Sequence, residues 1–94
     1  MDKALQTKLL SHLLPYQPLR VSIFGSYARG EQNQQSDLDI LVQFKERISL
    51  LKLVQIEQSL SDELGIPIDL ITENSIKNPR LKKYIEQDLI TIYE

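Results

Sequence analysis

One stretch limits the fold of this chain more than any other: it begins Gly25-Ser26, continues for ten residues and ends Asp37-Leu38-Asp39. An apolar run leads into its glycine, and apolar residues alternate with polar ones after its acidic end. Because neighbouring side chains of a strand point to opposite faces, Asp37 and Asp39 are predicted to point the same way from one strand. The stretch therefore predicts two strands joined by a glycine turn and a polar loop, with paired carboxylates on one sheet face.

Helical and strand patterns on both sides of this stretch predict the other elements. Helices are expected where apolar residues recur every three or four positions between capping residues, and strands where apolar and polar residues alternate. In chain order, we expect a helix over 2–14, a strand over 19–24, a helical turn over 26–29 with Ser26 as its N-cap, a loop over 31–36, a strand over 36–44, a helix over 49–64, a strand over 66–71, a helix over 78–87 and a short strand over 89–93. The predicted fold class is α/β (α+β), a small mixed β-sheet with helices packed on one face.

Two smaller expectations concern the helices. The last long helix, over 78–87, is expected to bury Leu81, Tyr84 and Ile85. His12, the only histidine, lies on the first helix with no acidic or hydroxyl neighbour in the sequence, so we interpret it as a surface or packing residue rather than a catalytic one.

Composition narrows the classes of function. The 94 residues are expected to form one small domain over 1–94. The net charge is −2, and the basic residues are concentrated only in Lys77, Arg80, Lys82 and Lys83, which we interpret as a solvated helix face. No direct nucleic-acid binding is therefore expected. The absence of cysteine excludes disulfides and thiolate chemistry, and short apolar runs without a signal-peptide core favour a cytoplasmic protein without membrane contact.

The paired acids indicate a metal site. Two ionised carboxylates this close repel each other, and a divalent cation between them removes the repulsion. Mg²⁺ prefers oxygen ligands and is commonly held by one or two carboxylates together with substrate phosphates. Asp69 lies between Ile68 and Leu70, where a charge is costly without a partner, so it is the candidate third acid if its strand lies beside that of Asp37. The alternative is that these acids only solubilise an exposed sheet face.

The Gly-Ser end of the stretch indicates a phosphate site. Gly25 lets the backbone approach a phosphate closely, and the amides that open the Ser26 turn favour an anion. Arg29, one helical turn further on, can reach the same phosphate or the acidic loop, and a structural role for it is about equally open. A phosphate end and a metal end together are what nucleotidyl transfer from a nucleoside triphosphate requires, by attack on the α-phosphate with pyrophosphate leaving.

These residues resemble the signature of the DNA polymerase β-like nucleotidyltransferase superfamily, Gly-Ser-x(9–13)-Asp-x-Asp. The similarity extends over Gly-Ser-Tyr-Ala-Arg-Gly, over the strand Ser-Asp-Leu-Asp-Ile-Leu-Val and over Ile-Asp-Leu-Ile, which carries the third acid. At this length, the chain is similar to the minimal nucleotidyltransferase (MNT) branch, the antitoxins of HEPN/MNT toxin-antitoxin systems. The resemblance implies a palm-like fold of the polymerase β type.

The resemblance also implies a reaction and a partner. An MNT antitoxin transfers AMP from ATP to a tyrosine of a HEPN-domain RNase toxin and silences it. Carried over to this chain, Gly25 and Ser26 bind the nucleotide phosphates, Asp37 and Asp39 hold Mg²⁺ as part of a two-ion site, and Asp69 is the third ligand or the base that activates the acceptor. The chain lacks the Arg-x(4–6)-His element of HEPN RNases, so it is not expected to be the toxin.

Two further functions stay open at this point. The first is a non-catalytic antitoxin that neutralises its partner by binding, with the site reduced to nucleotide binding or left without a function. The second is a transferase with a small-molecule acceptor, although about ninety residues leave little chain to hold an acceptor. A partner that brings its own docking surface fits this size better.

Overall fold

Four strands form one mixed sheet in the computed structural model, which describes residues 1–94. They are β1 (Pro18–Phe24), β2 (Leu38–Phe44), β3 (Ile68–Thr72) and β4 (Ile90–Tyr93). Their order across the sheet is β3-β2-β1-β4. Strand β1 is antiparallel to both β2 and β4, whereas β2 and β3 run parallel. The predicted small mixed sheet is confirmed, and β3 and β4 are its edges.

Helices and short turns connect these strands. They are α1 (Lys3–Leu13), α2 (Ser26–Arg29), α3 (Leu50–Leu64) and α4 (Pro79–Gln87), with 3₁₀ turns η1 (Leu14–Tyr16) and η2 (Glu73–Ser75). Three helices have an N-cap residue whose side-chain oxygen accepts a backbone N–H of the helix. These residues are Asp2 for α1, Ser49 for α3 and Asn78 for α4. None of these helices is long and apolar enough to cross a bilayer.

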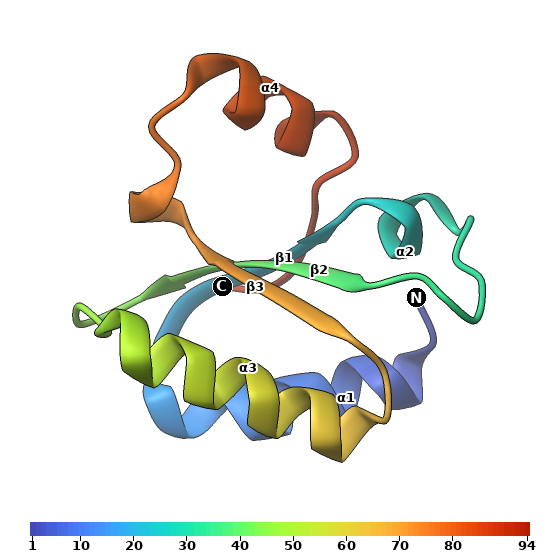
Figure 1. Cartoon of the computed structure of the whole chain (residues 1–94), viewed down its shortest axis with the longest axis horizontal. Coiled ribbons are helices and arrows are strands. Elements are labelled where there is room, and N and C mark those ends of the chain that lie inside the picture. The colour runs from blue at the N-terminus through green and yellow to red at the C-terminus, as the bar shows by residue number, and fades with distance from the viewer.

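The main core lies between the sheet and the helices α1 and α3, which run side by side below the sheet in Figure 1. Alternate residues of β2 point into this core, and Leu38, Ile40 and Val42 are fully buried there. Ile56 and Leu60 of α3 meet them, as the predicted helical stripe requires. His12 lies away from the acids, on α1, where its Nε2 is 2.9 Å from Ser59 Oγ of α3.

Helix α4 lies on the opposite face of the sheet, above it in Figure 1, so the expectation that all helices pack on one face was wrong for this helix. Ile85 is its only buried residue and packs against Phe24 and Leu41, which point away from the main core. Leu81 and Tyr84, expected to be buried, are 46% and 59% exposed. The physical reason is that a nine-residue helix touching a flat sheet along one line buries little more than one side chain.

Candidate active site

Gly25 follows the last residue of strand β1, beside the acidic end of strand β2. Phe24 of β1 is the register partner of Asp39, so the chain turns away from the sheet directly beside that carboxylate. Gly25 has a φ of +74°, and a Cβ placed on it would overlap the Asp39 carboxylate oxygen Oδ2. Glycine is therefore required twice at this position, by the left-handed backbone and by the close approach of Asp39.

Helix α2 follows at once and is one turn long. The sequence predicted Ser26 as its N-cap, but Gly25 occupies the cap position and Ser26 is the first helical residue. The reason is that the positive φ of Gly25 already turns the chain into the helix one residue earlier. Gly30, also at positive φ, ends the turn as predicted, and the first N–H groups of such a turn have no acceptor within it.

The third acid lies beside the second. In the parallel pairing of β2 and β3, Asp39 and Asp69 are direct register partners, which confirms the condition on which the choice of Asp69 depended. Asp37 lies just before β2, which begins at Leu38 rather than at the expected residue 36. Asp39 and Leu41 share a face because side chains alternate, so the acids lie on the α4 side of the sheet.

The electrostatics of the acids show how closely they interact. Burial, the largest cause, and repulsion from Asp69 and Asp37 together raise the pKa of the Asp39 carboxyl from 3.8 to about 6, and the Arg29 charge opposes this rise. The pKa of Asp69 is also raised, first by desolvation and then by repulsion from Glu57 and Asp37. Asp69 itself is exposed to solvent, so its desolvation reflects neighbouring protein rather than an enclosed site.

The donor set suits a hard divalent cation. Carboxylate oxygens are the ligands that Mg²⁺ prefers. Besides burial, repulsion between the acids raises the pKa of Asp39, and a cation would relieve this repulsion. The side chains as they stand do not form a closed metal cage, since no three His, Cys, Asp or Glu side chains lie in a metal-ligating arrangement. An open set of this kind is consistent with an ion that takes part of its coordination from substrate phosphates and water.

Arg29 has partners of its own. Its Nε donates to Glu31 Oε2 at 3.2 Å and its guanidinium donates to Asp88 Oδ2 at 3.1 Å. The Asp88 pair links α2 to the end of α4, whereas the Glu31 pair is local. Both raise the pKa of Arg29, and Asp88 contributes most. Both carboxylates are at the surface, so the pairing is weak and screened by solvent. The role of Arg29 in nucleotide binding stays a prediction.

Glu57 is a neighbour of the site that sequence reasoning missed. This α3 residue accepts the backbone N–H of Leu70 through its Oε2 at 2.8 Å, directly after Asp69 in β3. The available signal was a charged residue beside Ile56, at the border of the buried stripe of the helix. The pattern does not show that this side chain reaches across to a strand.

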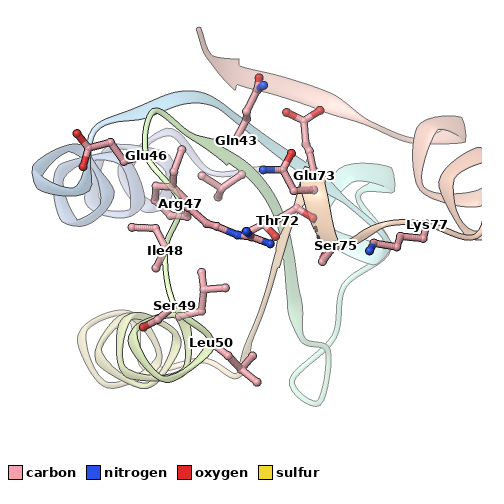
Figure 2. Close-up of a pocket in the computed structure, with 14 residues that line it drawn as sticks. Gln43, Glu46, Arg47, Ile48, Ser49, Leu50, Thr72, Glu73, Ser75 and Lys77 are labelled. Atoms are coloured by element: carbon pink, nitrogen blue, oxygen red, sulfur yellow. Dashed lines mark hydrogen bonds between the residues drawn. The ribbon is translucent and has the colours of Figure 1, made fainter.

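One pocket of the molecule lies elsewhere, at the far ends of β2 and β3. It has a volume of about 660 Å³ and is lined by Gln43, Thr72, Ser75 and the start of α3, among others. Figure 2 shows the Arg47 guanidinium pointing into it and Lys77 at its rim. None of the predicted site residues lines it, so this pocket is separate from the acids and the Gly-Ser turn.

Known proteins similar to this chain fall into one group. The family model described as "Nucleotidyltransferase domain" matches residues 5–92. A candidate protein adenylyltransferase of Methanocaldococcus jannaschii is 60% identical over 77 residues, covering 82% of this chain and 79% of the relative. Protein adenylyltransferase MntA of Thermococcus cleftensis is 42% identical over 67 residues, covering 71% of this chain and 68% of MntA.

Solved structures agree with this fold. A candidate minimal nucleotidyltransferase superposes with a TM-score of 0.78 at 35% identity, covering 96% of this chain and 95% of the other. A toxin-antitoxin structure with AMP-PNP gives a TM-score of 0.84 at 22% identity, covering 94% and 72%. An MNT antitoxin in complex with the tri-AMPylated HEPN toxin of Shewanella oneidensis gives 0.80 at 19% identity, covering 99% and 72%. Because the last two structures are less than 25% identical to this chain, they support the fold alone.

Proposed function

Because the chain belongs to the nucleotidyltransferase domain family, we propose that it transfers AMP from ATP to a tyrosine of a HEPN-domain toxin and so acts as an antitoxin. Residues 1–94 would act as one minimal nucleotidyltransferase domain, in the cytoplasm where its substrate ATP is found. Relatives that bear the name protein adenylyltransferase, and a similar fold seen with an AMPylated HEPN toxin, support the reaction and the partner.

One observation carries the proposal. The Gly25 backbone abuts the Asp39 carboxylate, and Asp39 is in register with Asp69. A phosphate held at the Gly25-Ser26 turn would therefore lie next to the acids, which is the proximity that phosphoryl chemistry needs.

The proposed reaction is a displacement at the α-phosphorus of ATP. The tyrosine oxygen forms a bond to this phosphorus, the bond to the oxygen that bridges the α- and β-phosphates breaks, and pyrophosphate leaves. The phenol proton goes to a general base, for which Asp69 is the candidate because its raised pKa makes it a better proton acceptor than an ordinary aspartate. The turn at Gly25 and Ser26 would hold the phosphates in place.

The proposed cofactor is Mg²⁺, and the resemblance to the family implies two ions. Asp37 and Asp39 would hold it, with Asp69 as third ligand if it does not serve as the base. When bound, Mg²⁺ neutralises phosphate charge and stabilises the attacking and leaving oxygens. Acids that repel one another in the free protein are the residues expected to hold such an ion.

Labelling of a protein substrate tests the proposal. The purified chain is incubated with ATP, Mg²⁺ and a HEPN toxin, and the intact mass of the toxin is measured. We expect the toxin to gain the mass of one or more AMP groups on tyrosine, and Asp37→Asn or Asp39→Asn to abolish the gain. A toxin that gains no AMP would contradict the proposal, and a double mutant that still neutralises the toxin would favour inhibition by binding.

A further inference from the structure

Glu57 connects helix α3 to the strand that carries Asp69. Its carboxylate is partly buried between the helix and the sheet, and its Oε2 lies 2.8 Å from the backbone nitrogen of Leu70. Helix α3 crosses beneath β3 in Figure 1, which lets a side chain of the helix reach the strand. The hydrogen bond joins residues 13 positions apart, so it fixes tertiary rather than local structure.

Strand β3 needs such a contact because it is a sheet edge. Its inner side is paired to β2, and its outer side has no neighbouring strand. An edge strand of five residues exposes outward N–H groups and is held on one side alone. The Glu57 carboxylate accepts one of these N–H groups, in the peptide that joins Asp69 to Leu70, so this peptide is held from both sides.

We propose that Glu57 is a positioning residue that keeps Asp69 in register with Asp39 during nucleotidyl transfer; this inference rests on the function proposed above. Glu57 touches neither phosphate nor acceptor in this role. It acts through the backbone of β3, as the outer partners of metal ligands and catalytic groups commonly do.

The geometry predicts which kinetic constant changes. Asp69 lies on β3, whereas the phosphate turn at Gly25 and Ser26 lies at the end of β1, two strands away. Loosening β3 would misplace the third acid and leave the phosphate turn intact. Loss of Glu57 should therefore lower kcat and leave KM for ATP unchanged, because an interaction made only in the transition state is lost.

Three variants test this. Glu57→Ala removes the acceptor, and Glu57→Gln keeps an acceptor oxygen without the charge. Glu63→Ala, an exposed residue of the same helix with no side-chain hydrogen bond, is the matched control. We expect kcat for toxin labelling to fall roughly tenfold to a hundredfold in Glu57→Ala, to stay within about threefold of wild type in Glu57→Gln, and to be unchanged in Glu63→Ala.

Amide hydrogen exchange gives a second readout that does not depend on activity. The Leu70 amide should exchange faster in Glu57→Ala and at the wild-type rate in the other two variants. Unchanged Leu70 exchange in Glu57→Ala, or a Glu57→Gln as impaired as Glu57→Ala, would overturn the inference. A wild-type chain that labels no toxin would instead overturn the proposed function, while the exchange experiment would still report on the Glu57 contact.

Discussion

At the scale of single residues, Gly25 makes the sharpest prediction. Gly25→Ala places a methyl group against the Asp39 carboxylate and a side chain at a φ of +74°. We expect AMP transfer to fall at least about a hundredfold, since a displacement of about 1 Å at reacting groups has effects of this size. The free energy of unfolding should fall by about 1–3 kcal/mol, because this φ with a ψ of −153° is a backbone region that essentially glycine alone adopts. Steady-state labelling and urea unfolding measure the two effects.

Gly65→Ala is the control for this change. Gly65 ends α3 at a nearly equal φ of +70°, and a Cβ there would meet nothing within 4 Å. Its ψ of 21° places it in the ordinary left-handed region, so the alanine should cost about 1–2 kcal/mol, less than Gly25→Ala, while activity is kept. If both alanine variants were equally active, the close approach of Gly25 to Asp39 would have no functional importance.

Asp39 makes a prediction about pH. Its pKa in the folded state is about 6, above the ordinary value of 3.8. The folded protein thus binds this proton more tightly than the unfolded chain, so the stability linked to it is full below about pH 4 and is lost as the pH rises through 6. In EDTA, Asp39→Asn should therefore be more stable than wild type at pH 7.5, by about 1 kcal/mol after allowance for solvent screening.

Thermal unfolding between pH 4 and 7.5 measures this difference. The advantage of Asp39→Asn should shrink as the pH falls toward 4, because the wild-type carboxyl is then neutral as well. Asp62→Asn, an exposed acid of α3 away from the site, should show no such trend. A destabilised Asp39→Asn at neutral pH would mean that the carboxylate serves the fold rather than ligand binding.

The sequence suggested Asp37 and Asp39 by their spacing and Asp69 by its place between two apolar residues, and strand pairing places Asp39 and Asp69 side by side. The sequence alone could not select Glu57, because the hydrogen bond to Leu70 depends on how α3 crosses β3. It also misplaced the start of α2. Serine is a common N-cap, and whether a preceding glycine takes that position depends on its φ, which the residue type leaves free.

At the scale of elements, α4 depends on one side chain. Ile85 is 1% exposed and packs on Phe24 and Leu41. Ile85→Ala should lower the free energy of unfolding by about 2–4 kcal/mol, the usual cost of such a truncation in a core. Tyr84→Ala, at a position that is 59% exposed, should cost less than about 0.5 kcal/mol. Urea unfolding of both variants measures these two losses of unfolding free energy. Equal losses in the two variants would contradict the packing of α4 through Ile85.

The positions of helices and strands followed from the sequence because caps and periodicity are local signals. The side of the sheet on which a helix packs is not local. The apolar residues of α4 gave no indication that only one of them would touch the sheet, because Leu81 and Tyr84 repeat at the same helical spacing. The opposite face of the sheet carries Phe24 and Leu41, and covering them decided where α4 lies.

At the scale of the whole molecule, the two ends of the site should bind their ligand together. ATP with Mg²⁺ should raise the unfolding temperature, and at ligand concentrations a hundred times Kd the stabilisation should be about 2.7 kcal/mol. ATP in EDTA should give a much smaller rise. A variant with both Asp37→Asn and Asp39→Asn should show no difference between the two conditions. An equal rise for the wild type with and without Mg²⁺ would contradict a metal site at these acids.

The parallel pairing of β2 with β3 has a consequence for how the protein matures. Asp39 and Asp69 are thirty positions apart in the chain, and a parallel pair can form only after the whole α3 crossover has been made. Contacts of this kind close late, because the entropy of a long loop is lost before any pairing is gained. A nascent chain that has emerged only as far as residue 60 already contains the complete Gly-Ser and Asp-x-Asp motif, yet it has no strand to carry the third acid. We therefore expect the proposed site to be completed only when β3 pairs with β2, after α3 has formed.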